Sequence, residues 1–350
     1  MTSTFRVRAT LTGAALVLAG LLAACSAPKP PPPPPPPPPA VSLSPRLIEQ
    51  ASAYRTYMQR ATAISPAFAD GAAIAQSLKV GAAYEPGQLL RGAVAYGAVA
   101  ALQDPAFVAG VRTYSTDPTL RQTVTAQIIR DPAYVALLPG ASGGAGLVMA
   151  ALGEEGRKLW VSGRAVKQAA YDVQHSPWSK ASVENRPARL SEAKMLSATP
   201  GLGEMAETAR LQQAALGAAP LGLTGAPASA PYTPLVIRSM AVAALAVLGQ
   251  AGDENLDKVM AVAAEPGAAS CLNMSKLNLY QCLAVSVPHY EDVFCLGQHI
   301  MMDTGKCLMK GAGMPEPIDV KTTPLTIAAA DAPAKASATA VAAAPTTRKR

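Results

Sequence analysis

The chain has 350 residues, of which 50% are hydrophobic and 15% are charged, and it contains 32 prolines and 27 glycines. This composition excludes a highly charged disordered protein, and the length allows one large core or two modest ones. The net charge of +7 is small for this length, and residues 348–350 supply three of the positive charges, so nucleic acid is not expected as a partner.

Residues 1–24 have the pattern of a secretory signal peptide. Arg6 and Arg8 precede an apolar stretch, residues 11–24, that is too short to span a bilayer as a stable helix. The stretch ends in Leu22-Ala23-Ala24-Cys25, which resembles the lipobox of bacterial lipoproteins. The resemblance implies that Cys25 becomes the first residue of the mature protein and carries its lipid, so that the membrane is a partner through this anchor.

The residues after the lipobox imply where the anchor resides. Ser26 stands where an aspartate would favour retention in the inner membrane, which implies the outer membrane, facing the periplasm; the inner membrane is the alternative. Within residues 25–44, the unbroken run Pro30–Pro39 predicts a polyproline II rod about 30 Å long. We interpret this rod as a spacer; a ligand for a proline-recognition domain is the alternative.

The remaining sequence predicts an all-α fold, a helical bundle or an array of alanine-rich helices. Alternating β-branched residues are scarce, and a capping residue followed by proline recurs at Ser65, Asp104, Asp117 and Asp131, which predicts four helix starts. The clearest helix covers residues 147–173. Its apolar stripe, which predicts a core-facing side, consists of Val148, Leu152, Leu159, Gly163, Val166, Ala170 and Val173.

Composition divides the folded part of the chain. We expect a helical domain over 45–216, a linker or long loop over 217–233, a C-terminal helical region over 234–312 and a disordered tail over 313–350. The third of these segments opens with a buried core helix, Leu235–Leu248. Earlier in the chain, Gly92 and Gly97 lie beside an apolar helical face and are expected to let another helix approach closely.

One motif suggests catalysis. The sequence from Gly140 to Gly144 matches G-x-S-x-G, the nucleophile elbow of α/β-hydrolases, with Ser142 as the nucleophile and residues 134–138 as a short strand before it. Pro139 next to the turn and the lack of a series of parallel strands favour a glycine-rich start of a helix instead. Asp172 and His175 are too close in the chain to act as typical triad partners.

Few other residues are candidates for catalysis or metal binding. The carboxylate pairs Glu154–Glu155 and Glu204/Glu207 are interpreted as solvated helix surface, and the chain has only three histidines. We therefore expect no cofactor and no metal.

Four cysteines follow the anchor, and in an oxidising periplasm they predict two disulfides; a zinc site is the alternative. Cys271 and Cys282 would lie roughly 16 Å apart along one helix, beyond the ~7 Å limit between bridged α-carbons. An antiparallel pair of helices, the second over 291–303 and ended by Gly305, instead joins Cys282 to Cys295 and Cys271 to Cys307. This nested pairing resembles twin-cysteine helical hairpins, although Cys307 is about a third of a turn out of phase.

Two functions remain open from the sequence. The first is a non-catalytic envelope lipoprotein that acts as a membrane-tethered helical interaction or assembly module, with an envelope protein as its partner. The second is a periplasmic serine hydrolase that uses Ser142. Residues 22–39 give the chain a resemblance to the proline-spacered envelope lipoproteins of alphaproteobacteria, whose functions are largely undefined; the rest of the chain resembles them only loosely.

Overall fold

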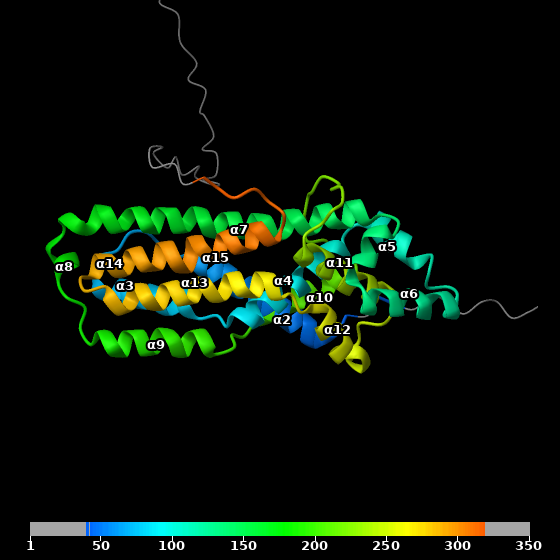
Figure 1. Cartoon of the computed structure of the whole chain (residues 1–350), viewed down its shortest axis with the longest axis horizontal. Coiled ribbons are helices and arrows are strands. Elements are labelled where there is room, and N and C mark those ends of the chain that lie inside the picture. The colour runs from blue at the N-terminus through cyan, green and yellow to red at the C-terminus, as the bar shows by residue number, and fades with distance from the viewer. Residues whose placement is uncertain (1–39, 42, 319–350) are drawn as a thin grey trace, which may run out of the picture. The chain divides into compact units, whose positions relative to one another are not determined.

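A computed structural model describes residues 40–41 and 43–318, and most of this part of the chain is helical (Figure 1). Its β-structure is limited to two isolated bridges, Leu43–Ala251 and Ser182–Pro288. The predicted all-α class is therefore confirmed. Cys25, the proline run Pro30–Pro39 and residues 319–350 of the predicted tail lie outside the described residues.

The elements follow one another through short turns, with one longer loop between α10 and α11. They are α2 Pro45–Thr62, α3 Gly71–Ala82, α4 Pro86–Ala101, α5 Pro105–Arg112, α6 Pro118–Arg130, η1 Pro132–Leu137, α7 Ala141–Asp172, η2 Val173–His175, α8 Pro177–Lys180, α9 Arg186–Ala198, α10 Met205–Ala215, α11 Pro234–Val247, η3 Asp253–Asn255, α12 Leu256–Ala263, α13 Pro266–Val285, α14 His289–Cys295, the π-helical turn η4 Leu296–Met302 and α15 Asp303–Gly311.

One hydrophobic core joins the two halves of the sequence. Most buried apolar residues from Leu43 to Ala312 form one contiguous cluster, and α11 lies inside it against α4 and α7; Trp160, Met302 and Met309 form a small second cluster. The segments 45–216 and 234–312 therefore share a core. Residues 217–233 form a long loop, and this loop does not separate two domains.

Helix α7 runs along the length of the helical body (Figure 1). All of its predicted stripe is buried except Val173, which is half-buried and follows the helix. Glycines let the α14–η4–α15 segment lie close to it: a Cβ on Gly156 would be 2.8 Å from the Gly305 carbonyl oxygen, and one on Gly163 would be 2.7 Å from Met301 Cβ. Gly305 therefore provides close packing and does not end the helix as predicted, since α15 continues to Gly311.

Close approach is also confirmed at the two glycines of α4. A Cβ on Gly92 would lie 2.4 Å from the Gln50 carbonyl oxygen of α2, and one on Gly97 would lie 2.4 Å from Ser239 Oγ of α11. These positions place α4 between α2 and α11 in the centre of the core.

The predicted helix starts are confirmed in part. The side chains of Asp104 and Asp117 accept hydrogen bonds from backbone amides in the first turns of α5 and α6, while Asp131 caps the 3₁₀ turn η1. Ser65 starts no helix: its Oγ accepts from the amide of Ala67 in a local turn, and Asp70 caps α3. Serine side chains stabilise such turns as readily as helix starts, which explains the wrong prediction.

Two nested disulfides bind α13 to the segment that follows it. Cys282 pairs with Cys295 next to the turn and Cys271 pairs with Cys307 at the open end, each with α-carbons 5.7 Å apart. The predicted pairing is confirmed, and the zinc alternative is wrong because every cysteine of this region is in a disulfide.

The π-helical turn η4 explains how Cys307 comes into phase. Cys295 and Cys307 are 12 positions apart, so an unbroken α-helix at about 100° per residue would leave Cys307 about 120° away from the face of Cys295. A π-turn holds one more residue than an α-turn. With one residue accommodated in this way, the 12 positions match the 11 that separate Cys271 from Cys282 on α13.

Candidate functional site

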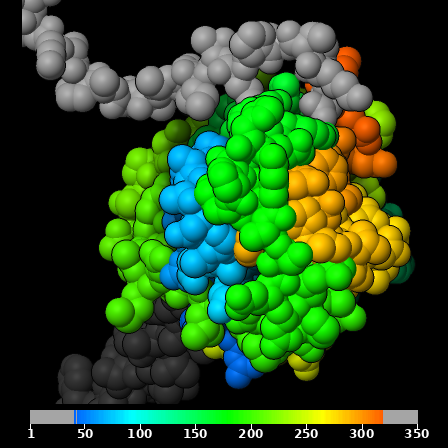
Figure 2. Space-filling view, turned by 90° about the vertical axis from the view of Figure 1, so that its left-hand side faces the viewer, coloured from blue at the N-terminus to red at the C-terminus, as the bar shows by residue number. Residues whose placement is uncertain are grey.

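A groove of about 620 Å³ opens between α3 and α9 at the end of the body where α7 also finishes. We call it the α3–α9 groove. Figure 2 shows this end, where the light-blue side chains of α3 are flanked by green residues of the segment that runs from α7 to α9. The groove is lined by Leu78 of α3, by Ala188 and Leu196 of α9, and by Leu283 and His289 beneath them.

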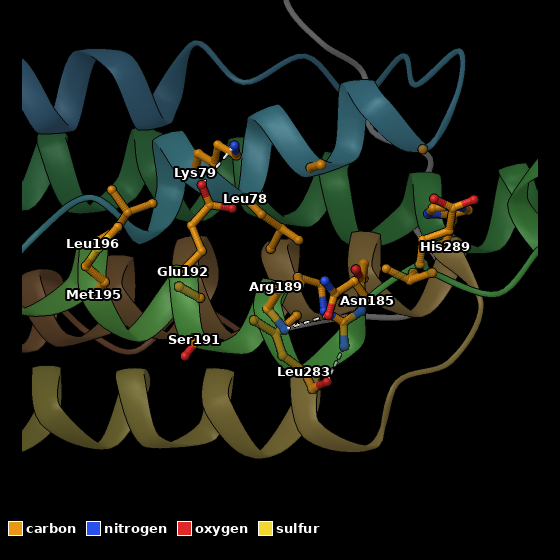
Figure 3. A pocket seen from close by; sticks show the side chains of 17 residues that line it. Leu78, Lys79, Asn185, Arg189, Ser191, Glu192, Met195, Leu196, Leu283 and His289 are labelled. Atoms are coloured by element: carbon orange, nitrogen blue, oxygen red, sulfur yellow. Dashed lines mark hydrogen bonds and ion pairs between the residues drawn. The ribbon is translucent and has the colours of Figure 1, made fainter.

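The rims of the groove are polar. Lys79 Nζ lies 2.8 Å from Glu192 Oε1 and links α3 to α9 across the opening (Figure 3). At the other end, the His289 ring packs against Gly71, where an added Cβ would lie only 2.4 Å from its Cε1 atom. Because both partners of the Lys79–Glu192 pair are substantially exposed, this ion pair contributes little stability.

A second ion pair closes the bottom of the groove. Arg189 Nη1 of α9 binds Asp292 of α14, Arg189 Nη2 donates to the Leu283 carbonyl oxygen, and Ser286 Oγ donates to Asp292 Oδ1 at 2.7 Å. Asp292 is buried; loss of solvation raises the pKa of its carboxyl, and the Arg189 charge opposes this increase. The Nε atom of Arg189 is buried without a hydrogen-bond partner.

Lys276 is the most unusual group of this region. It is 3% exposed, and its Nζ donates to the Ala82 carbonyl oxygen at 2.8 Å and to Ser197 Oγ at 3.0 Å, so it joins α13 to the end of α3 and to α9. Nζ also lies 3.3 Å from the centre of the Tyr84 ring. No salt bridge involves Lys276 in the described part of the chain, and burial lowers its pKa well below the usual value; the field of Glu85 opposes this decrease.

Hydroxyl groups continue this polar cluster into the core. The Tyr84 hydroxyl lies 2.8 Å from Thr304 Oγ1, which lies 3.0 Å from Ser275 Oγ, and Ser275 donates to the His299 carbonyl oxygen. Burial raises the pKa of Tyr84 to about 12. The cluster is therefore a hydrogen-bonded network that holds the π-helical turn against α13.

The burial of Lys276 could have been predicted from its position in the sequence, although the sequence analysis did not single it out. Leu272, Lys276, Leu279 and Leu283 follow each other at helical spacing, and all four are buried on one face of α13. A lysine in the middle of an apolar stripe indicates a buried cation. Arg189 gave no such signal, because its partner Asp292 is distant in sequence and only the fold brings the two together.

In the structure, the carboxylates of the two predicted pairs bind arginine side chains and do not act as pairs with each other. Glu154 remains at the surface with Arg157, but Glu155 and Glu207 both bind Arg55, at 2.5 Å and 3.1 Å. The side chains of Glu155 and Glu207 are only 12% and 9% exposed, so the interpretation of these two residues as solvated surface is wrong. Their role is to join α2, α7 and α10 through one guanidinium group.

Ser142 lies in the first turn of α7 and is exposed. The residues before it form the 3₁₀ turn η1, not the strand of a nucleophile elbow. Asp172 and His175 are at the other end of α7, about 45 Å away at 1.5 Å per residue. His299 follows Gly297, which packs on Gly163, about 30 Å along α7 from Ser142. The structure therefore brings none of these groups to Ser142.

Residues 40–41 and 43–318 contain no cluster of three or more metal-binding side chains. Over the same residues, no single helix is long and apolar enough to cross a membrane, although the bent pair α4 and α5 passes the test of length and composition together. Comparison with protein-family models, with curated proteins and with solved structures finds no match to this chain.

Proposed function

We propose that this chain is a non-catalytic lipoprotein of the bacterial cell envelope, whose helical body is a membrane-tethered interaction or assembly module. The lipobox that ends at Cys25 carries the proposal, because it supplies both the export signal and the anchor. The two disulfides of the body support it, since such bonds persist in oxidising compartments such as the periplasm.

The proposed arrangement places the body at a distance from the membrane. The prolines Pro30–Pro39 would act as a spacer of about 30 Å between the lipid on Cys25 and the first helix, α2. The proposed site of the module is the α3–α9 groove, which offers an apolar floor with charged groups on its rims. A partner protein of the envelope is the proposed ligand.

The anchor is tested by replacing Cys25. In the bacterial host, Cys25→Ala is expected to abolish labelling by radioactive palmitate and to move the protein out of the membrane pellet or block processing. Ser26→Ala is the matched control and should keep both the label and the sedimentation. Unchanged palmitate labelling and sedimentation of Cys25→Ala would contradict the proposal.

The choice of membrane is tested at the neighbouring position. Separation of the two membranes on a density gradient is expected to place the parent protein in the outer membrane. Ser26→Asp should shift it to the inner membrane, and a parent protein already in the inner membrane would favour the alternative location.

A further inference from the structure

Helix α9 is attached to the body through few buried residues. Only two of its 13 residues are buried, Ala193 and Ser197, and both are small; α6 also buries only two of its 13 residues, but these have larger, branched side chains. Leu190 and Leu196 are half-buried at its sides. In α7, by comparison, 15 of 32 residues are buried. The apolar contribution to holding α9 in place is therefore small.

Polar contacts provide most of the attachment. Besides the Arg189–Asp292 and Lys79–Glu192 pairs, Arg186 Nη2 donates to the Ala284 carbonyl oxygen at 2.9 Å, and Lys194 Nζ lies 5.8 Å from the centre of the Tyr280 ring. The Arg189–Asp292 pair is largely buried, with side chains only 11% and 3% exposed, but the groups in the other contacts are near the surface, where water can replace them at small cost. The α3–α9 groove adds an incompletely filled space beside the helix.

The surface beneath α9 contains a buried amine, Lys276, for which α9 provides no acidic partner. We call it the α9-binding surface; it consists of Lys79 and Ala82 of α3, Lys276 and Leu283 of α13, and Asp292 of α14. Ser197 is the only residue of α9 that binds the Lys276 amine, and it offers a neutral hydroxyl. A carboxylate at that place would make a buried, charge-assisted pair with Lys276.

We propose that α9 is a releasable strap, and that the α9-binding surface accepts, in its place, a partner helix that presents a carboxylate to Lys276. The fit of α9 itself defines the shape of this partner: an amphipathic helix with small residues one turn apart where Ala193 and Ser197 now lie. The acidic group follows from charge complementarity with Lys276. This inference rests on the proposed role as an interaction module. It places the partner on the surface that α9 uncovers on release, beside the α3–α9 groove, and it specifies the chemistry of that partner.

Release of the strap is tested on the full chain in detergent. Hydrogen exchange is expected to be at least about tenfold faster in α9 than in α13 or α7, because few apolar contacts must be broken. Lys276 should react with an amine-directed acylating reagent at a rate that follows α9 exchange, well before global unfolding. Equal protection of α9 and α13, with Lys276 unreactive until the protein unfolds, would overturn the strap.

A matched pair of variants tests the same release of α9 within the chain. Ser197→Asp places the proposed carboxylate on α9 itself, and it should slow both α9 exchange and Lys276 acylation relative to the parent. Ser197→Asn has a similar size without the charge and should not. Faster opening in Ser197→Asp than in Ser197→Asn would contradict the role given to Lys276.

The partner chemistry is tested with peptides of residues 183–200 added to the full chain. A peptide with Ser197→Asp is expected to bind at least about tenfold tighter than one with Ser197→Asn, as measured by fluorescence anisotropy. In a chain with Lys276→Met, this preference should vanish. Absence of binding, or a preference that persists in Lys276→Met, would overturn the acidic partner. These results do not depend on where the protein is anchored, so they are separate from the tests of Cys25.

Discussion

A single buried ammonium group gives this protein a defined dependence on pH. Burial lowers the pKa of Lys276, so the folded chain binds fewer protons than the unfolded chain between that lowered value and the ordinary lysine pKa of about 10.4. Over this range the free energy of unfolding rises with pH, because protons favour the unfolded state. Below the lowered pKa, the folded state bears the full cost of burying the charge.

Replacing Lys276 should therefore stabilise the protein. We predict that Lys276→Met raises the free energy of unfolding at pH 7 by about 1–2 kcal/mol and removes the part of its rise towards pH 10 that Lys276 causes. The substitution leaves the Ala82 carbonyl oxygen bonded, since Ser197 Oγ still donates to it at 3.1 Å. Urea unfolding from pH 6 to pH 10 measures both effects. Lys79→Met at the surface is the control, and a Lys276→Met protein less stable than the parent at pH 7 would refute the argument.

Ser142 lacks the partners that would activate it. We predict that a fluorophosphonate probe gives no labelling of the purified protein that is lost in Ser142→Ala, because no histidine lies close enough to accept the hydroxyl proton. Mass spectrometry of the probe-treated protein, with a known serine hydrolase as the positive control, decides the matter. Stoichiometric labelling of Ser142 would restore the hydrolase alternative.

At the scale of the elements, α7 and α15 can pack closely because glycines, Gly156 and Gly305, lie where the two helices meet. We predict that Gly156→Ala lowers the free energy of unfolding by about 1–3 kcal/mol, since its Cβ would lie 2.8 Å from the Gly305 carbonyl oxygen and 2.9 Å from the Met309 amide nitrogen. Gly201→Ala is the control, because its nearest neighbours would be 3.9 Å away. Equal stability of the two variants in urea would show that α7 and α15 can separate without cost.

The π-helical turn gives a prediction about chain length. Deleting Gln298 from η4 should convert the π-turn into an α-turn while Cys307 stays in phase with Cys295, so both disulfides should form. Inserting one alanine at the same place should rotate Cys307 by about 100° and prevent the Cys271–Cys307 bond in part of the protein. Peptide mapping without reduction measures both pairings. Loss of the Cys271–Cys307 bond in the deletion variant would contradict the role assigned to η4.

Local signals explain which elements the sequence could predict. Asp104 and Asp117 predict helix starts because cap and proline act within one turn, and the cysteine pairing follows because two helices leave few arrangements within reach. The role of Gly305 was predicted wrongly because the residue on which it packs, Gly156, is close in space but far away in the sequence. The α3–α9 groove was missed for the same reason, because its two walls are separated by more than a hundred residues in the sequence.

At the scale of the whole molecule, the long loop before Pro234 is not a boundary between folding units. Helix α11 is apolar on almost every side and is buried between α4 and α7, both of which precede the loop. Without α11, the face of α4 that contains Gly97 and packs on Ser239 would lose its cover and expose apolar surface to water. A chain that ended at the loop would therefore lack the centre of its own core.

We predict that the protein unfolds in one cooperative transition and that residues 40–216 alone do not fold. Far-ultraviolet circular dichroism reports on all helices, while the fluorescence of Trp160 and Trp178 reports on the region where α7, α14 and α15 meet; the two urea curves should coincide. The fragment 40–216 should instead show little cooperative change and should bind a hydrophobic dye, because α11 and the α13–α15 segment supply much of the surface that covers α4 and α7. Separate transitions, or a fragment that unfolds cooperatively, would show that 45–216 is a domain after all.

Because the disulfides constrain only residues 271–307, reducing them should shift this single transition to lower urea concentration without splitting it.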